Sequence, residues 1–358
     1  YGIEEIYILS GFLSDVIVDY FKDGSEFGVN IQHVVEKEPL GTAGALKQLE
    51  DLFSDEKFMV FYGDTLMDID LLRFIEFEKD KDDSLGAVIV HPNDHPYDSD
   101  LIEIDNHHKI TRMYLKPHDN KKFYQNLVNA ALYILSPAIF KYIEFGKSQD
   151  LCKDVFSKLL GKENLYAYRT CEYIKDMGTP ERLALVEKDL IHGKVSKLNK
   201  SKKQKAIFLD RDGVINVEVD NLSDIDDFSF IDKVPNAIKS INHSEYISIV
   251  LTNQPVIAKG FLSIEGLSQI HRKMDTLLGR ERAYLDDLYF CPHHPEKGFV
   301  GEVEELKVDC DCRKPNIGMF LSAAHDHCID LQKSWMIGDR YADIVAGAIY
   351  RDDLETGG

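Results

Sequence analysis

The sequence predicts an α/β protein of two domains, and three observations support this. The 358 residues exceed one average domain and suffice for two hydrophobic cores. Short apolar runs alternate with amphipathic stretches in both halves, as in layered α/β folds. The basic, polar stretch 194–205 is typical of a solvated linker, with a nucleic-acid-binding arm as the alternative. We therefore expect a first domain at 1–193, this linker, and a second domain at 206–358.

In the first half, six short apolar runs predict strands, and one helix has clear end signals. Thr179 can cap that helix, Pro180 fits its first position, and the pattern ends near His192 and Gly193. The predicted strands are 6–9, 31–35, 58–61, 87–90, 130–135 and 166–168.

In the second half, four nearly all-apolar runs predict buried parallel strands at 206–209, 247–251, 288–290 and 335–337. Polar residues or a cysteine follow these runs closely. Ligand sites of open parallel sheets lie beyond the carboxyl ends of the strands. We therefore expect the residues that follow these runs to converge in space.

Composition excludes several classes of protein. No apolar run approaches the roughly 20 residues of a membrane span. Lys and Arg number 42 against 62 Asp and Glu, and the resulting formal net charge of −20 repels nucleic acids and anionic lipids. We therefore expect neither nucleic acid nor a membrane as partner. Six cysteines are too few for a secreted disulfide scaffold, which predicts a reducing, cytoplasmic compartment. The oligomeric state is not indicated.

The first strand of the second half leads directly into a candidate catalytic motif. Asp210 could attack phosphorus to form an aspartyl-phosphate, while Asp212 protonates the leaving group and later activates water. Gly213 lets the chain turn sharply. Mg²⁺ is expected between Asp210, the main-chain carbonyl of Asp212, and Asp339. For this motif alone, a solvated acidic loop is the alternative.

Two further residues complete the expected catalytic set, because Thr252 and Lys314 can donate to phosphoryl oxygens. The segments 210–213, Thr252, Lys314 and 338–339, in this order, resemble the four motifs of haloacid dehalogenase-like (HAD) phosphatases. This resemblance implies a Rossmannoid phosphatase domain with Mg²⁺ as cofactor.

A cluster of soft ligands lies between the third and fourth strands of this half. Three thiolates and one imidazole suffice for a closed, structural Zn²⁺ site. It would order the loop that carries Arg313 and Lys314. His294 could replace His293 as the ligand, and buried free cysteines are the other alternative. The expected zinc ligands are Cys291, His293, Cys310 and Cys312.

Within the HAD group, the segments 208–216, 251–254, 291–295 and 310–315 resemble the D-glycero-D-manno-heptose 1,7-bisphosphate 7-phosphatases. Histidinol-phosphate phosphatases share these motifs and are the alternative. The resemblance stops after Gly347, where one more strand is expected, so the carboxyl terminus is expected to be truncated. The substrate-binding residues it implies are Asn253, Gln254, Arg313 and Arg340.

The first half contains a second candidate site, because Asp64 and Asp176 could share one Mg²⁺. Together with the segments 36–44, 116–117 and 129–130, these residues resemble the sugar-nucleotidyltransferases, in particular heptose 1-phosphate guanylyltransferases. The resemblance implies attack of a sugar 1-phosphate oxygen on a nucleoside triphosphate, with release of pyrophosphate. It assigns nucleotide binding to Gly41, Thr42 and Ala43 and sugar-phosphate binding to Lys116 and Asn129.

Two departures from that family stand out. Its Gly-rich G-G-x-G-T-R-L loop is absent, and because Tyr1 lies within an apolar pattern, we expect this loop upstream in the intact parent. Ala131 stands where the family often has Gly. A first domain that acts only as a non-catalytic scaffold is therefore the alternative to an incomplete nucleotidyltransferase Rossmann-like domain.

Together, the two resemblances imply consecutive steps of activated-heptose synthesis for lipopolysaccharide or surface-layer glycans. The second half would remove the 7-phosphate of the bisphosphate, and the first would couple heptose 1-phosphate to a nucleotide, with guanosine as the expected nucleoside. Mg²⁺ and Zn²⁺ are the implied cofactors. A sugar phosphate and a nucleoside triphosphate are the implied small-molecule partners.

Overall fold

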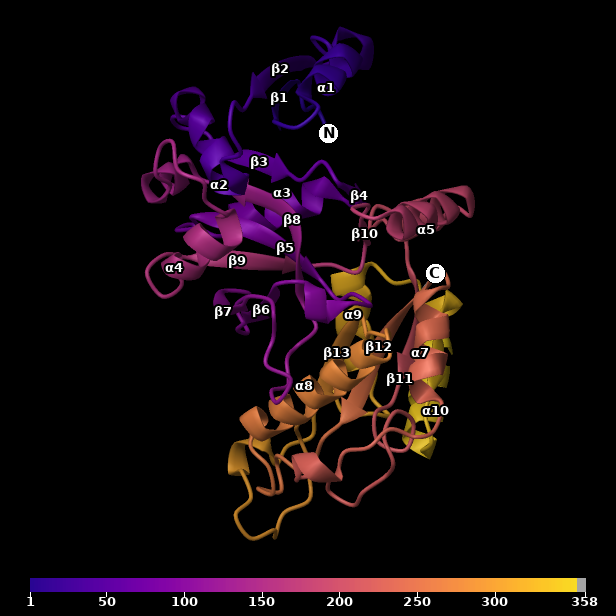
Figure 1. The fold of residues 1–358 in the computed structure, drawn as a ribbon. Coiled ribbons are helices and arrows are strands. Elements are labelled where there is room, and N and C mark those ends of the chain that lie inside the picture. Colours follow the sequence, from indigo (N-terminus) through magenta and orange to yellow (C-terminus); the bar gives the residue numbers. More distant parts are fainter. Residues whose placement is uncertain (353–358) are drawn as a thin grey trace.

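The computed structural model describes residues 1–352, and both halves are layered α/β structures, as predicted. The first half occupies the upper part of Figure 1 and the second half the lower part. Residues 341–352 form a helix, so the strand expected after Gly347 is not found there. The other residues for which this strand was predicted, 353–358, lie outside the described residues.

The strands of the first half form a mixed sheet and two short pairs. The main sheet has the order β7-β6-β8-β5-β9, with β3 also antiparallel to β8. β1 pairs with β2 in parallel, and β4 pairs with β10 in antiparallel fashion. The strands are β1 (Glu5–Ser10), β2 (Asn30–Val35), β3 (Phe58–Phe61), β4 (Thr65–Asp68), β5 (Gly86–His91), β6 (Leu101–Ile104), β7 (Ile110–Tyr114), β8 (Val128–Leu135), β9 (Leu165–Arg169) and β10 (Tyr173–Asp176).

The six predicted strands of this half are all present, whereas β4, β6, β7 and β10 were not predicted. The predicted helix is α5, and the Thr179 hydroxyl caps it by accepting a hydrogen bond from the Arg182 amide at 3.3 Å. The helices are α1 (Ser14–Phe21), α2 (Gly41–Leu46), α3 (Leu71–Lys79), α4 (Ser157–Leu159), α5 (Pro180–Ile191) and α6 (Lys194–Lys197).

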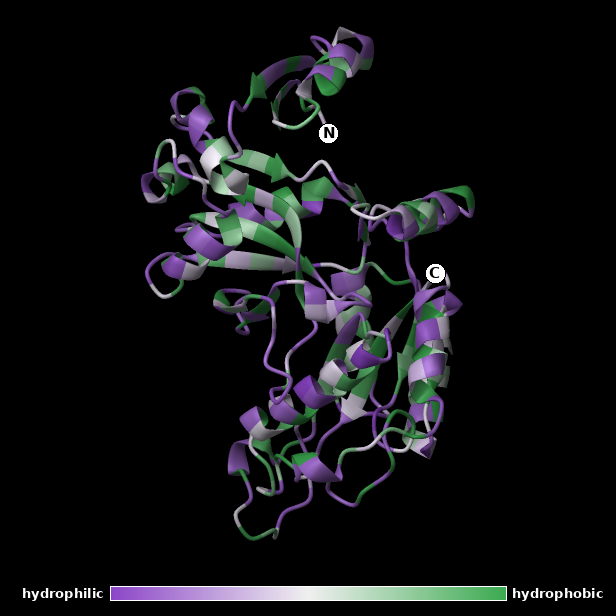
Figure 2. Ribbon diagram, in the orientation of Figure 1, coloured by the Kyte–Doolittle hydropathy of each residue, from purple (hydrophilic) through white to green (hydrophobic). Residues whose placement is uncertain are grey.

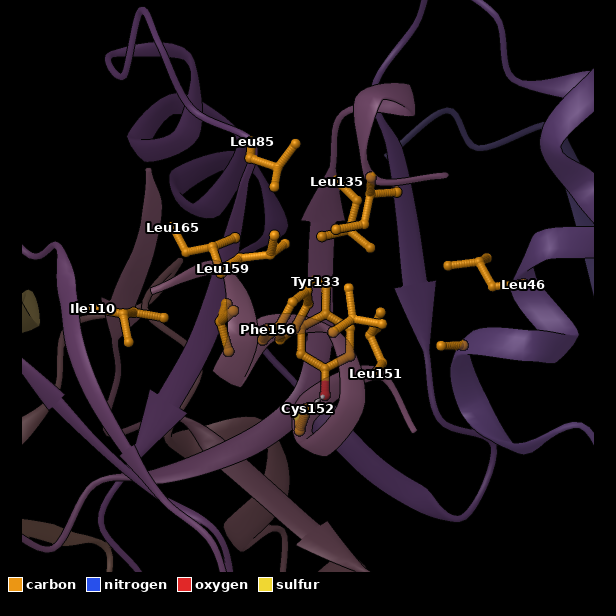
Figure 3. Packing of buried hydrophobic residues seen from close by; sticks show 14 of the residues in the cluster. Leu46, Leu85, Ile110, Tyr133, Leu135, Leu151, Cys152, Phe156, Leu159 and Leu165 are labelled. Atoms are coloured by element: carbon orange, nitrogen blue, oxygen red, sulfur yellow. Dashed lines mark hydrogen bonds between the residues drawn. The ribbon is translucent and has the colours of Figure 1, made fainter. Parts of the chain in front are cut away.

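The core of the first half is built around Tyr133 of β8. Its ring packs edge-on against Phe156, and its hydroxyl points toward the Cys152 thiol, 3.6 Å away (Figure 3). Leucines from β8, β9 and the helical segments fill the surrounding space. This cluster fixes β8, and Asn129 of the same strand, from the candidate first-half site, donates to the Tyr133 hydroxyl at 2.8 Å.

The second half is a parallel sheet in the order β13-β12-β11-β14, which confirms the predicted parallel strands. Successive residues of β11 point to opposite faces, as the period of two requires. Phe208 packs with α9 and α10, whereas Leu209 packs with α7 and α8. The elements are β11 (Lys205–Leu209), β12 (Tyr246–Asn253), β13 (Asp287–Cys291), β14 (Trp335–Ile337), α7 (Val234–Asn242), α8 (Ile264–Arg280), α9 (Gly318–His327) and α10 (Tyr341–Asp352).

Figure 2 shows hydrophobic residues along the strands of both halves. The prediction that 335–337 is buried was wrong, because Trp335 is 55% exposed and Ile337 47%. Within the part of the chain that the structure describes, β14 is an outer strand that pairs with β11 alone. Within residues 1–352, no helix combines the length and apolar character that crossing a bilayer requires.

The segment 194–205 is folded and packed, which corrects the expectation of a solvated linker. Val195 and Leu198, three residues apart on α6 and its end, are buried with Cys171 and Tyr173 in the core of the second half. Lys200 is only 2% exposed, because its amide donates to Glu172 and its ammonium lies 5.2 Å from the Tyr168 ring centre. The segment therefore packs against residues of both halves.

Polar contacts also hold the halves together along α8 and β13. The Thr276 hydroxyl accepts from the Tyr124 amide at 2.8 Å, and the Asp275 carboxylate accepts from the Asn126 amide at 3.2 Å. Arg169 of β9 forms an ion pair with Asp287 at 2.5 Å. The amino-terminal end of β13 thus faces the first half.

Candidate active sites

Three carboxylates meet at the carboxyl ends of the strands in the second half. Asp210 follows β11, Asp339 follows β14, and Asp343 lies in the first turn of α10. One ligand oxygen of each lies within 4.8 Å of the others. The Lys314 ammonium lies 3.0 Å from Asp210 Oδ1 and 2.6 Å from Asp343 Oδ1. The predicted convergence of residues from the strand ends is therefore present, and the three carboxylates surround the buried ammonium of Lys314.

Sequence reasoning missed Asp343, although its spacing carried a signal. Asp339 lies in the bend after β14, and Asp343 follows four residues later in the first turn of α10, so one short stretch brings both carboxylates to the cluster. The Asp343 carboxylate also accepts a hydrogen bond from the Arg340 amide at 3.1 Å. Burial raises the pKa of Asp210 to about 6, a rise that Lys314 opposes and Asp343 increases.

Two glycines allow this close packing. Gly213 has a φ of +79°, and a Cβ there would overlap the Asp339 carboxylate. A Cβ on Gly338 would overlap Asp343. The sharp turn expected at Gly213 is therefore present.

The Asp212 side chain does not join the three carboxylates. The Arg211 guanidinium, fully buried, binds both of its oxygens at 2.8 Å, and Gln254 Nε2 donates to Oδ2 at 2.7 Å. His271 Nε2 lies 3.2 Å from Arg211 Nη1. Sequence reasoning missed Arg211 and His271, because a buried arginine within an acidic turn has no distinctive pattern. The predicted contact of the Asp212 carbonyl with a cation stays a prediction.

The remaining predicted residues of this half gather around the same cluster. Asn253 Nδ2 donates to the Lys314 carbonyl and its Oδ1 accepts from the Lys314 amide, both at 3.0 Å. Thr252 is buried, and its hydroxyl accepts from Gln254 at 2.9 Å. A cavity of about 220 Å³ opens over the cluster. Its walls include Asp210, Asp212, Asn253, Gln254, Arg313, Lys314, Arg340 and Asp343.

The predicted soft ligands also converge, with His293 and not His294 in the group. Cys312 Sγ lies 3.2 Å from Cys291 Sγ, 3.3 Å from Cys310 Sγ and 3.2 Å from His293 Nδ1. These separations exceed a disulfide bond, and the four ligand atoms lie close enough together to surround one metal ion. The Arg313 guanidinium donates to the His293 carbonyl at 3.2 Å, which ties this loop to the cavity.

In the first half, Asp64 and Asp176 are brought together. Asp176 ends β10, and the next amide, of Met177, donates to the Asp64 carbonyl at 2.7 Å. Arg182 Nη1 donates to the Asp176 carboxylate at 2.8 Å. Burial opposes ionisation of Asp176, but the Arg182 hydrogen bond and charge outweigh it and lower its pKa. Both aspartates line a cavity of about 760 Å³.

Of the other predicted residues of this half, Asn129 alone lines that cavity. The Lys116 ammonium donates instead to the Asp98 carbonyl at 2.8 Å. Gly41 has a φ of +68°, and a Cβ there would contact the Gln149 carbonyl at 2.5 Å. The Gln149 backbone thus already lies beside Gly41, where a nucleotide base was expected to approach. The Thr42 hydroxyl binds Asp150, and Ala43 is fully buried. Nucleotide and sugar-phosphate binding by these residues stays a prediction.

Ala131, next to the site, adopts the left-handed conformation with a φ of +56°. This conformation costs an L-residue energy that glycine avoids. Ala131→Gly is therefore expected to raise the free energy of unfolding by about 0.5 to 1 kcal/mol, as measured by urea denaturation. The control is Ala130→Gly, on the neighbouring buried position, whose φ is not positive, and this change should lower the free energy of unfolding. Equal losses in both variants would contradict strain at Ala131.

Comparison with known proteins gives matches in both halves. A family model described as nucleotidyl transferase matches residues 1–192, and one described as HAD-hydrolase-like matches 311–349. The D-glycero-β-D-manno-heptose-1,7-bisphosphate 7-phosphatase of Haemophilus influenzae is 43% identical over 144 residues, 40% of this chain and 75% of that protein. That of Escherichia coli K12 is 43% identical over 141 residues, 39% and 72%. The crystal structure of HddC from Yersinia pseudotuberculosis is 25% identical, covering 53% and 80%, with a TM-score of 0.46.

Proposed function

We propose that this chain hydrolyses the 7-phosphate of D-glycero-β-D-manno-heptose 1,7-bisphosphate. The chain belongs to the nucleotidyl transferase family and, through its second half, to the D-glycero-β-D-manno-heptose-1,7-bisphosphate 7-phosphatases. The first half is proposed to transfer a nucleotidyl group, with GMP as the expected group, to the heptose 1-phosphate that remains. This pairing supplies nucleotide-activated heptose for surface glycans. The free cysteines agree with a reducing, cytoplasmic compartment.

One observation supports the phosphatase above all others: a buried aspartate at a strand end lies against a buried lysine and two more carboxylates. Asp210 Oδ2 would attack phosphorus while the sugar oxygen leaves, forming an aspartyl-phosphate. Lys314 holds the opposite oxygen of Asp210 and supplies positive charge beside the phosphoryl group. Asp212 would give a proton to the leaving oxygen and later take one from the attacking water.

The carboxylate cluster fits Mg²⁺, because this hard cation prefers oxygen ligands. Asp210 and Asp339, with the Asp212 carbonyl, are the expected ligands, and Asp343 lies close enough to join or orient them. Bound there, Mg²⁺ would neutralise charge on the phosphoryl oxygens and on Asp210. The Asp64 and Asp176 pair is proposed to hold a second Mg²⁺ for nucleotidyl transfer.

The thiol cluster is proposed to hold one structural Zn²⁺ through Cys291, His293, Cys310 and Cys312. Metal analysis of purified protein is expected to find about one zinc per chain. Cys310→Ser should lower this content and the thermal midpoint, whereas Cys328→Ser, outside the cluster, should change neither. A zinc-free protein with full phosphatase activity would contradict the structural role.

The phosphatase proposal is tested by measuring phosphate release from heptose 1,7-bisphosphate and from histidinol phosphate, each with Mg²⁺. The heptose substrate should give the larger kcat/KM, and NMR of the product should show an intact 1-phosphate. A larger value for histidinol phosphate would replace the assignment with the alternative phosphatase. If neither compound releases phosphate, both phosphatase assignments are refuted.

A further inference from the structure

The cavity that Asp64 and Asp176 line lies between the two halves. The first half contributes Asp64, Asn129 and Asp176 to its walls. The second half contributes Arg282, Tyr284 and Asp286, which precede β13, and the joining segment contributes Lys194. Its volume of about 760 Å³ lies within the range of small-molecule sites. The proposed transfer site therefore includes residues from beyond residue 193.

The cations that line this cavity differ in how they are paired. Arg182, from the first half, is bound to Asp176 and Asp98, each at 2.8 Å. Lys175 lies 3.7 Å from Asp94. Among the described residues, by contrast, no carboxylate forms an ion pair with Lys194 or Arg282. Those two cations are thus available to an anionic ligand.

The Lys194 side chain is also held in place. The Lys194 ammonium donates to the carbonyl of Asn242, at the end of α7, at 2.7 Å. Burial lowers the pKa of Lys194, a shift that the charge of Asp189 opposes most and the charges of Asp286 and Asp94 oppose less. Arg282 lies in the turn that ends α8, where its amide donates to the Gly279 carbonyl at 2.9 Å. Arg282 is exposed and lines the cavity.

We propose that Lys194 and Arg282 bind the phosphate of the sugar 1-phosphate, so that the second half completes the transfer site of the first. This inference rests on the proposed nucleotidyl transfer. Two cations can neutralise a phosphate dianion, and a guanidinium can bind two of its oxygens at once. Lys116, the residue expected in this role, is not on the cavity wall.

The test is calorimetric titration of the full chain with heptose 1-phosphate and, separately, with GTP. The phosphatase site is first blocked with Mg²⁺ and beryllium fluoride, a mimic of an aspartyl-phosphate. Arg282→Gln and Lys194→Gln are each expected to raise the dissociation constant for heptose 1-phosphate about 10-fold, because each loses a charge-assisted hydrogen bond. Arg282→Lys keeps the charge but loses the second hydrogen bond, so it should raise this dissociation constant less than Arg282→Gln does.

Matched controls are Arg280→Gln and Lys197→Gln. Arg280 also lies at the end of α8 but lines a different cavity, and Lys197 pairs with Glu245 at 3.0 Å. Both controls should bind heptose 1-phosphate and release phosphate as the wild type does, and all four glutamine variants should still be folded at the temperature of the titration.

Three outcomes would overturn the inference. If Arg282→Gln and Lys194→Gln bind heptose 1-phosphate as the wild type does, the inference fails while the transfer proposal stands. If these variants lose affinity for GTP alone, the two cations bind a triphosphate instead. If the wild type binds neither compound, the proposed transfer fails and the inference fails with it.

Discussion

Asp210→Asn is expected to lower the rate of phosphate release on the order of 10⁴-fold or more, the size of loss seen when a catalytic nucleophile is removed. An amide has no negative oxygen with which to attack phosphorus. It also cannot form the charged contact that Asp210 makes with Lys314 at 3.0 Å. The measurement is steady-state release of phosphate from heptose 1,7-bisphosphate at saturating Mg²⁺.

Loss of activity in this variant should not come from unfolding. Because burial raises the pKa of Asp210 to about 6, its charged form is costly in the folded protein near neutral pH. A neutral amide removes that cost, so the thermal midpoint is expected to stay level or rise. Asp232→Asn, on an exposed residue, should change neither the rate of phosphate release nor the thermal midpoint. Asp210→Asn activity within 10-fold of the wild type would rule out the aspartyl-phosphate.

Lys314→Met is expected to destabilise the metal-free protein by about 3 to 5 kcal/mol at neutral pH. It removes the ammonium that lies between Asp210 and Asp343 and leaves two buried carboxylates to repel each other. Urea denaturation in EDTA at pH 7.5 measures the loss. Phosphate release should fall as well, because the positive charge beside the phosphoryl group is gone.

The loss in Lys314→Met should shrink as the pH falls. The pKa of Asp210 is already raised in the folded wild type, so this group adds stability below its unfolded pKa and loses it as the pH rises through about 6. Without Lys314 this pKa must rise further, and protonation at pH 5.5 should relieve part of the repulsion. Lys333→Met, on an exposed pair with Asp330, should change stability by less than about 0.5 kcal/mol at both pH values. A loss independent of pH would point to packing rather than charge.

The positions of the phosphatase residues could be predicted because they depend on local pattern and on one rule of topology. Apolar runs identified β11 and β12, and parallel strands bring their carboxyl ends to one edge. Asp210 and Asp339 therefore met as expected. Asp343 was missed because it is reached through a helical turn rather than a strand end.

Other features depend on tertiary contacts that leave weak traces in a single sequence. Lys200 is part of a basic run, yet Tyr168 and Glu172, both about 30 residues earlier, bury it. The exposure of Trp335 depends on which strands flank β14, not on its own apolar neighbours. The Lys116 ammonium donates a hydrogen bond to the Asp98 carbonyl, a contact that no sequence pattern predicts.

The orientation of the second sheet has a consequence for how the two proposed reactions are coupled. The phosphatase cavity lies at the carboxyl ends of its parallel strands, whereas Arg282 and Asp286 border the other cavity before β13 begins. Eight-residue β12 alone spans about 25 Å between these edges, and in the described chain the two cavities share no lining residue. Heptose 1-phosphate must then pass through bulk water between the steps, where an added competitor enzyme could intercept it.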